Sequence, residues 1–350
     1  MLRLPSFRYH RPATLDEALE RLAGLGPEAV PIAGGTDLMP NMKHGLFTPA
    51  HLVSLNRVDA MKGTRVAGGD GVKGNGRPAE LAGTFLEIGA LETLADLAAH
   101  PAVRFHAPAV AQAAGLVAGP QLRNMGTIGG NVCLDTRCTY YNQTKFWRHA
   151  LGYCLKKDGD VCHVTRVGRK CVAAHSADTP AALIAHDAVL TLAGPSGARD
   201  LAAADFFVPD GIRNTRRGDD EILTRVRIPI VPGRRSAYRK LRQRSSIDFP
   251  LLSLAVAADF AEDASVATIR GVVSALGARP RLLSGWDAIA AGTRLEPDVV
   301  EALADRARRQ CRPLDNIIVD AEWRRAMVPV YARRALRELA GDPSTAGAGA

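Results

Sequence analysis

Cysteines are the residues whose type and spacing most clearly suggest chemistry in this sequence. The chain has 350 residues and only six cysteines, yet four of them follow one another at intervals of 16, 8 and 9 residues. These four are Cys138, Cys154, Cys162 and Cys171. A long polar segment with no core of its own needs a cross-link to offset the entropy lost on ordering. The pattern therefore predicts one metal site with four thiolate ligands.

The nature of this site stays open at this point. Scattered free thiols are one alternative and disulfides are another, but disulfides require an oxidising compartment. The start of the chain, Met1 to Pro5, has neither the apolar segment nor the cleavage site typical of secretion, so we expect a cytoplasmic protein with reduced thiols. The spacing fits no short zinc-ribbon pattern. His149, His163 and His175 nevertheless keep a zinc site as an alternative to an iron–sulfur cluster.

Composition argues against two classes of partner. The formal net charge is +9, but aromatic residues make up only 5% of the chain, and nucleic-acid binding usually combines basic with aromatic residues. No run of about 18 apolar residues, long enough to cross a bilayer, is present. We therefore expect neither nucleic acid nor membrane as a partner.

The cysteine segment itself is basic. Between Cys138 and Cys171, seven lysines and arginines stand against Asp158 and Asp160, which gives a net charge of +5. The basic residues are Lys145, Arg148, Lys156, Lys157, Arg166, Arg169 and Lys170. Such a surface would steer an acidic protein partner, and the alternative is an ordinary solvated loop.

Two glycine turns follow the expected elements of the first half. A short buried strand at residues 29–32 leads into Ala33-Gly34-Gly35-Thr36-Asp37-Leu38, and Gly126-Thr127-Ile128-Gly129-Gly130-Asn131 forms the second turn. Glycine lets backbone N–H groups approach a pyrophosphate closely. Neither turn matches a dinucleotide or Walker motif, so each alone is also consistent with an ordinary turn.

Several helices and strands must position these segments. Thr14 and Glu17 form a capping box for a helix over 14–24, and Asp178 with Pro180 opens a helix that ends at His186. Other expected elements are a strand at 51–55, a strand at 86–89 leading into a helix at 91–99, a helix at 108–116, and strands at 189–192 and 222–228. Residues 63–76 contain six glycines and are expected to form a loop or hairpin tip.

A second domain is expected after residue 230. Strands at 253–260 and 267–276 precede helices at 286–291, 297–309 and 321–339, the order typical of an α+β domain. Cys311 lies among these elements and is expected to be a core residue. The tail, 341–350, is expected to be disordered.

The two glycine turns, together with Ser176-Ala177-Asp178-Thr179-Pro180 and Tyr238-Arg239-Lys240, resemble the FAD-binding subunit of the molybdenum hydroxylases, the group of xanthine dehydrogenase and carbon monoxide dehydrogenase. The resemblance covers nearly the whole chain. It implies an α+β fold with a two-part, vanillyl-alcohol-oxidase/PCMH-like FAD-binding domain at 1–230, divided into 1–57 and 58–230. A smaller α+β domain at 231–340 follows.

About forty additional residues, at about 133–173, interrupt this resemblance. The insertion resembles the one in the flavin subunit of 4-hydroxybenzoyl-CoA reductase, which holds a [4Fe-4S] cluster. The resemblance therefore implies that Cys138, Cys154, Cys162 and Cys171 ligate such a cluster. Cys133 matches no ligand of the family and is expected to be a structural thiol.

The resemblance also implies a set of flavin-binding residues, with no catalytic residue on this chain. Residues 32–39 would wrap the FAD pyrophosphate, Thr127 to Asn131 would form a second wall, Asp178 would accept bonds from cofactor hydroxyls, and Lys240 would approach from the C-terminal domain. The full set is Ile32, Ala33, Gly34, Gly35, Thr36, Asp37, Leu38, Met39, Thr127, Ile128, Gly129, Gly130, Asn131, Asp178 and Lys240.

Function follows from the same resemblance. It implies an oxidoreductase subunit that passes electrons from ferredoxin through [4Fe-4S] and FAD to partner subunits with [2Fe-2S] clusters and a molybdopterin centre, where 4-hydroxybenzoyl-CoA is reduced to benzoyl-CoA. The partners would form a heterotrimer that dimerises. The alternatives are the FAD subunit of a xanthine dehydrogenase-type hydroxylase and a zinc-stabilised binding scaffold.

Overall fold

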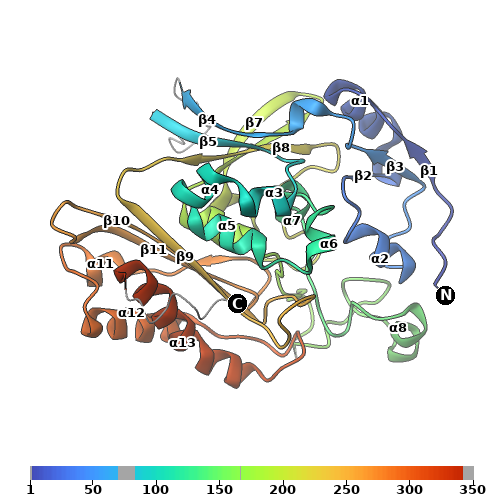
Figure 1. The fold of residues 1–350 in the computed structure, drawn as a ribbon. Helices are drawn as coiled ribbons and strands as arrows, with labels where there is room; N and C mark the ends of the chain where they lie inside the picture. Colours follow the sequence, from blue (N-terminus) through green and yellow to red (C-terminus); the bar gives the residue numbers. More distant parts are fainter. Residues whose placement is uncertain (1, 70–82, 166, 342–350) are drawn as a thin grey trace.

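The computed structural model describes residues 2–69, 83–165 and 167–341. Residues 70–76 of the glycine-rich stretch, Arg166 and the tail from 342 onward therefore lie outside the described residues. Three sheets and the helices packed against them make up the described chain (Figure 1).

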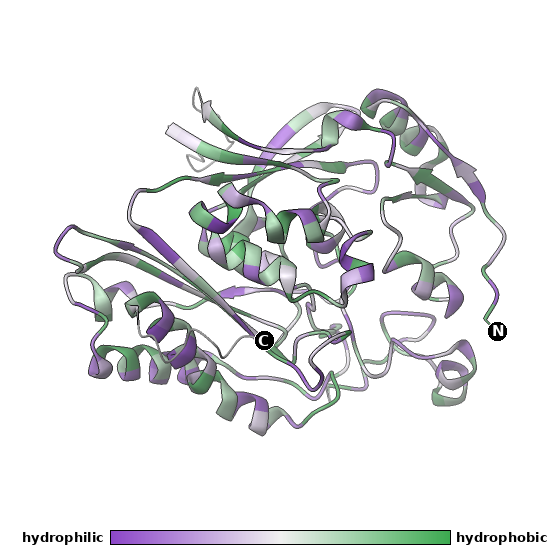
Figure 2. Cartoon of the chain, viewed as in Figure 1, coloured by the Kyte–Doolittle hydropathy of each residue, from purple (hydrophilic) through white to green (hydrophobic). Residues whose placement is uncertain are grey.

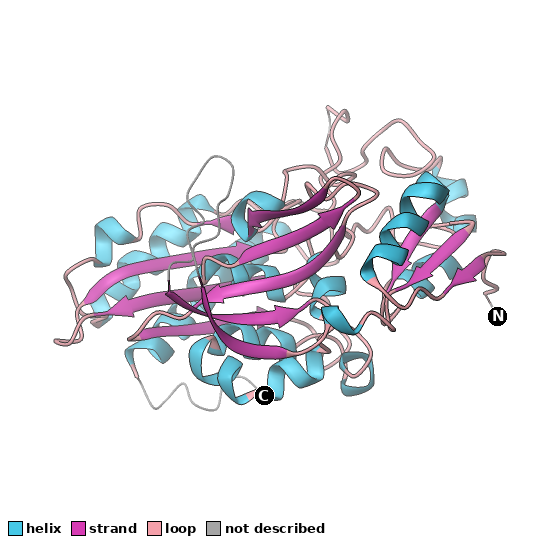
Figure 3. Ribbon diagram, turned by 90° about the horizontal axis from the view of Figure 1, so that it is seen from above, coloured by secondary structure: helices cyan, strands magenta, loops and turns pink. Residues whose placement is uncertain are grey.

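The N-terminal sheet is parallel, with strand order β1-β3-β2. Its strands are β1 (Arg8–His10), β2 (Ala29–Ile32) and β3 (His51–Ser54), joined by helices α1 (Leu15–Leu25) and α2 (Leu38–Lys43) and the 3-10 turn Gly26–Glu28. The Thr14 hydroxyl accepts a bond from the Glu17 backbone N–H, as the capping-box prediction requires, and the Glu17 carboxylate accepts from the Ala13 N–H. Figure 3 shows this unit to one side of the longer strands.

An antiparallel five-stranded sheet has the order β4-β5-β8-β6-β7. The strands are β4 (Thr64–Gly69), β5 (Gly83–Gly89), β6 (Val189–Gly194), β7 (Gly197–Ala202) and β8 (Ile222–Pro229). The expectation of a loop over the whole of 63–76 is thus wrong for 64–69, where backbone pairing with β5 overrides the low strand propensity of glycine.

A layer of helices lies under this sheet: α3 (Leu94–Ala99), α4 (Pro101–His106), α5 (Pro108–Gly115), α7 (Ile128–Val132) and α9 (Thr179–Ala185). The short helices α6 (Pro120–Arg123), α8 (Lys145–Leu151) and α10 (Ala203–Phe206) lie in the connections. The alanine-rich helix α5 is largely apolar in Figure 2 and is buried on most of its surface. Small side chains let it pack closely between two sheets.

The second layer of strands is the antiparallel sheet β12-β11-β10-β9. Its strands are β9 (Arg234–Leu241), β10 (Leu252–Phe260), β11 (Val266–Ser274) and β12 (Arg281–Leu282). Helices α11 (Asp287–Ala290), α12 (Pro297–Gln310) and α13 (Ala321–Ala340) cover its outer face, and Cys311 is fully buried in that core, as expected. The α+β fold class is confirmed. Within the described ranges, no helix has the length and apolarity needed to span a bilayer.

Candidate flavin and metal site

The two glycine turns lie against each other. The first turn connects β2 to α2, and the second runs from the end of α6 into α7. A Cβ placed on Gly34 would overlap the Met125 carbonyl, and one on Gly126 would lie 3.3 Å from the Thr36 Oγ1. Glycine is therefore required at residue 34, and a side chain at residue 126 would have little room. The structure brings the two predicted flavin-binding segments together.

The second turn is held by its neighbours. The Thr127 hydroxyl caps α7 by accepting the Gly130 N–H at 3.1 Å, and the Gly129 N–H donates to the Ala90 carbonyl at 2.9 Å. A Cβ on Gly129 would come within 2.8 Å of Ala90, whereas Gly130 is exposed. Asn131 is buried, and its side-chain oxygen accepts from both the N–H and the hydroxyl of Thr179. The turn is thus fixed to the start of α9.

Asp178 and Lys240 form a buried ion pair. Lys240 Nζ donates to Asp178 Oδ2 at 3.0 Å and to the Leu116 carbonyl at 3.0 Å, and the Tyr238 hydroxyl donates to Asp178 Oδ1 at 2.6 Å. Burial raises the pKa of Asp178, against the opposing effect of the Lys240 charge. Asp178 stands at the N-cap position of α9, as expected, but its side chain makes no capping hydrogen bond. Its acceptors are turned toward β9 instead.

Arg137 connects the first glycine turn to the cysteine segment. Its guanidinium pairs with Asp37, donates to Asn41 at 3.3 Å and lies over the Phe249 ring at 4.5 Å. Burial lowers its pKa to about 10. Because the next residue is Cys138, this one side chain links both predicted cofactor sites.

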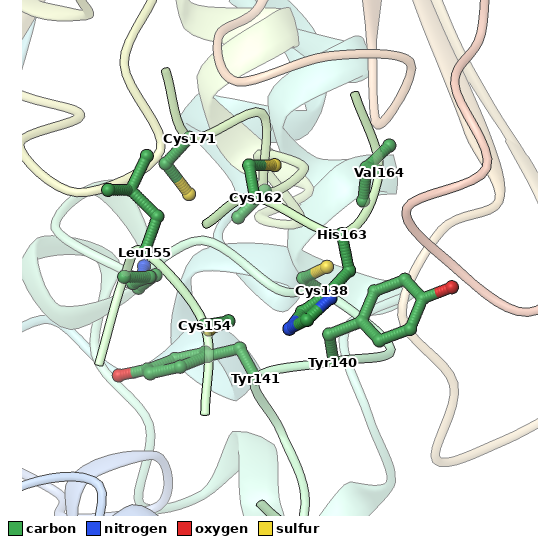
Figure 4. A pocket seen from close by; sticks show the side chains of 11 residues that line it. Cys138, Tyr140, Tyr141, Cys154, Leu155, Cys162, His163, Val164 and Cys171 are labelled. Carbon is green, nitrogen blue, oxygen red and sulfur yellow. The ribbon is translucent and has the colours of Figure 1, made fainter. Parts of the chain in front are cut away.

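The four predicted cysteine ligands line one pocket, shown in Figure 4. They come from separate stretches of the segment, and each is less than a tenth exposed: Cys138, Cys154, Cys162 and Cys171. The segment is anchored at both ends, because Arg137 and Ala174 exchange backbone hydrogen bonds of 2.8 and 2.7 Å. Leu46, Tyr141 and Ala173 pack around three of the cysteines, so the expectation that the segment has no core of its own is wrong.

The surroundings of three of these thiols shift their pKa values in different directions. Burial raises the pKa of Cys138 to about 12 and also raises the pKa of Cys171. For Cys162, burial acts in the same direction, but backbone N–H groups of Val164 and Thr165 outweigh it and lower the pKa. All six cysteines are described and are free thiols, so the disulfide alternative is not realised.

All four thiols belong to the lining of one pocket. Among the described residues, no group of three or more histidine, cysteine, aspartate or glutamate side chains is arranged to hold a metal ion. A single zinc ion needs all its ligands on one centre. A cluster spreads its ligands, because each thiolate binds a different iron atom. His163 lines the pocket but bonds to the Tyr153 carbonyl, and His175 bonds to Ser274.

Two of the basic residues assigned to a charged surface are buried. The side chain of Lys156 is 5% exposed and that of Arg148 is 1% exposed. Arg148 donates to the carbonyls of His44 and Gly45 at 3.1 Å, which ties α8 to the end of α2. The expectation of a uniformly solvated basic loop is therefore wrong for these two, while Lys145, Arg169 and Lys170 are exposed.

Three contributors have no role in the sequence-based prediction, although Tyr238 belongs to one of the motifs that carry the resemblance. Tyr238 shares Asp178 with Lys240, and the spacing of two residues, which puts both side chains on one face of a strand, was the available signal. Nothing in the local sequence marks Arg137 and Gly211, because the residues that they contact, Asp37 and Cys171, are distant in the sequence. A Cβ on Gly211 would lie 2.5 Å from the Cys171 Sγ.

Comparison with known proteins agrees with this architecture. The family described as the FAD binding domain in molybdopterin dehydrogenase matches residues 5–231, and the CO dehydrogenase flavoprotein C-terminal domain matches residues 236–339. The carbon monoxide dehydrogenase medium chain of Hydrogenophaga pseudoflava is 30% identical over 95% of this chain and 96% of its own length. An aldehyde oxidoreductase FAD-binding subunit of Escherichia coli is 33% identical over 72% of this chain and 77% of its own.

Solved structures give the same result. Reconstituted CO dehydrogenase from Oligotropha carboxidovorans superposes with a TM-score of 0.74 and 27% identity, covering 97% of this chain and 99% of that chain. The relatives' names describe medium chains and FAD-binding subunits, which are parts of larger oxidoreductases. The chain belongs to the family of FAD-binding subunits of molybdenum hydroxylase-type enzymes.

Proposed function

We propose that the chain is the electron-transferring flavin subunit of a 4-hydroxybenzoyl-CoA reductase, with a [4Fe-4S] cluster held by the four cysteines. The observation that carries the proposal is the pocket lined by Cys138, Cys154, Cys162 and Cys171, each of which is less than a tenth exposed. FAD exchanges one or two electrons and a cluster exchanges one at a time, so the two together supply a relay.

The proposal assigns roles to the residues of the chain. The backbone of residues 32–39 and 127–131 holds FAD, and Asp178 and Lys240 complete that site. The partners are a [2Fe-2S] subunit and a molybdopterin subunit, in a heterotrimer that dimerises in the cytoplasm. A division into an FAD-binding domain at 1–230 and a second domain at 231–340 belongs to the same proposal. The thioester is reduced to benzoyl-CoA on the molybdopterin partner.

The electron donor is an acidic ferredoxin that docks on the cysteine segment. Lys145, Arg169 and Lys170 are exposed there, together with the apolar side chains of Phe146 and Val167, which are each 84% exposed. A basic surface with apolar side chains favours a partner of opposite charge.

The rate at which reduced ferredoxin reduces the full chain tests this function. It should fall by at least about tenfold as salt is raised, and fall again in a Lys145→Glu/Lys170→Glu variant. Arg104→Glu/Arg308→Glu, with the same charge change on exposed positions outside the segment, serves as the control. A rate indifferent to salt and to the first variant would contradict the docking.

A second candidate is the FAD subunit of a hydroxylase that sends electrons outward, from the molybdenum centre to an external acceptor. The similarity to carbon monoxide dehydrogenase medium chains favours it. In that case ferredoxin would not reduce the chain, and the purified chain would show the yellow absorption of FAD without the broad brown absorption of a cluster.

A further inference from the structure

Lys156 is enclosed beside the four cysteines. It lines the same pocket, two residues after Cys154. Its Nζ donates to Asp135 Oδ1 at 2.6 Å, to the Gly211 carbonyl at 2.7 Å and to the Thr136 carbonyl at 3.3 Å, and it lies 4.5 Å from the centre of the Tyr141 ring. Nζ also lies 2.5 Å from the Thr136 hydroxyl oxygen, so four acceptors share the three donors of the ammonium group and use its full capacity.

Burying this ammonium group is expensive unless nearby charge compensates it. Among the residues that the structure describes, Asp135 is its only carboxylate partner, and the other acceptors are neutral dipoles. The second Asp135 oxygen, Oδ2, is buried without a hydrogen-bond partner in the described part of the chain. The ion pair is thus held by the fold around the pocket and is not free to rotate into solvent.

The backbone around the pocket is built to keep this arrangement. The Gly211 carbonyl accepts from both Lys156 and the Thr136 hydroxyl, and the Gly211 N–H donates to the Cys171 carbonyl at 3.0 Å. The close approach of Cys171 Sγ leaves no room for a side chain at residue 211. Lys156 and Cys171 are therefore both held by the backbone of one residue, Gly211.

We infer that Lys156 is a positioning residue that raises the reduction potential of the centre bound by the four cysteines. This inference rests on the proposed function. Four thiolates leave an iron–sulfur centre anionic, and reduction adds a further negative charge. A fixed positive charge in a poorly solvated pocket stabilises the reduced form more than the oxidised form. Asp135 opposes this effect, because its carboxylate offsets part of the ammonium charge.

The test is a redox titration of the purified full chain, followed by electron paramagnetic resonance, with iron and sulfide determined on the same samples. Lys156→Met should keep its iron and shift the midpoint potential to a more negative value. Asp135→Asn, which leaves Lys156 in place, should shift it to a more positive value. Lys157→Met is the matched control: its side chain is 32% exposed and its nearest carboxylate, Asp158, lies at 3.6 Å. Its potential should stay at the wild-type value.

The outcomes separate this inference from the proposed function. Wild-type chain without iron would overturn the proposed function and this inference with it. Full iron with unchanged potentials in Lys156→Met and Asp135→Asn would overturn the inference alone. If Lys156→Met does not fold, Asp135→Asn decides, and a potential that is unchanged or more negative in that variant overturns the inference.

Discussion

Gly130 is the residue at which flavin binding can be tested with least disturbance to the fold. It is exposed, and a Cβ there would meet only the Thr127 hydroxyl, at 3.2 Å. Gly130→Asp should fold but place a carboxylate where the cofactor phosphates are proposed to bind. Binding of FAD should weaken by at least about tenfold, which is roughly 1.4 kcal/mol.

Flavin absorbance of the purified variant measures this effect. Gly24→Asp is a suitable control, since Gly24 is an exposed helical glycine with nothing within 4 Å of an added Cβ. Stoichiometric flavin in Gly130→Asp would argue against the assignment of the second turn.

Single residues also show where sequence reasoning fails. Lys156 was expected on the surface because lysine usually is. Its acceptors, Asp135 and Gly211, stand 21 and 55 residues away. No local pattern predicts such a pocket.

At the level of elements, loss of the Arg137 side chain should affect both the first glycine turn and the cysteine segment, because Arg137 connects the two. Arg137→Met would leave Asp37 without its cationic partner, at a cost of about 2 kcal/mol. Two effects should follow: weaker retention of FAD and faster proteolysis within 133–173. Flavin content and limited proteolysis with mass spectrometry measure them.

Arg65→Met provides the comparison. Arg65 pairs with Glu87 across β4 and β5, but its side chain is 68% exposed, so its loss should change neither property. Identical flavin content and cleavage in the two variants would show that Arg137 does not link the segments.

Helices and strands whose own residues show a capping box or an apolar run are predictable from the sequence. Helix α1 has a capping box in its own sequence, and β2, β6 and β10 are apolar runs. Strand β9 was missed because Arg239 and Lys240 are charged, and they are buried only because Glu338 and Asp178 pair with them from distant positions. Helix α8 was missed because Phe146 and Trp147 point to solvent, so its residues show no apolar face.

At the scale of the whole molecule, the layers place the two cofactor segments side by side. Asp37 and Cys138 belong to parts of the chain about a hundred residues apart, yet Arg137 joins them. The backbone N–H of Thr139 donates to the Asn316 carbonyl at 2.8 Å, so the cysteine segment also contacts the C-terminal part of the chain. This arrangement is consistent with the proposed relay, because the cysteine segment contacts both the first glycine turn and the C-terminal part of the chain.

Iron and acid-labile sulfide in three cysteine variants test the central claim most directly. Cys154→Ser removes one of the four proposed ligands, whereas Cys133 and Cys311 lie outside the pocket. The account predicts that Cys154→Ser loses iron and sulfide but retains FAD, since the glycine turns are separate from the segment, and that Cys133→Ser and Cys311→Ser keep both. A Cys154→Ser chain with its full complement of iron, or a Cys133→Ser chain without it, would contradict the assignment.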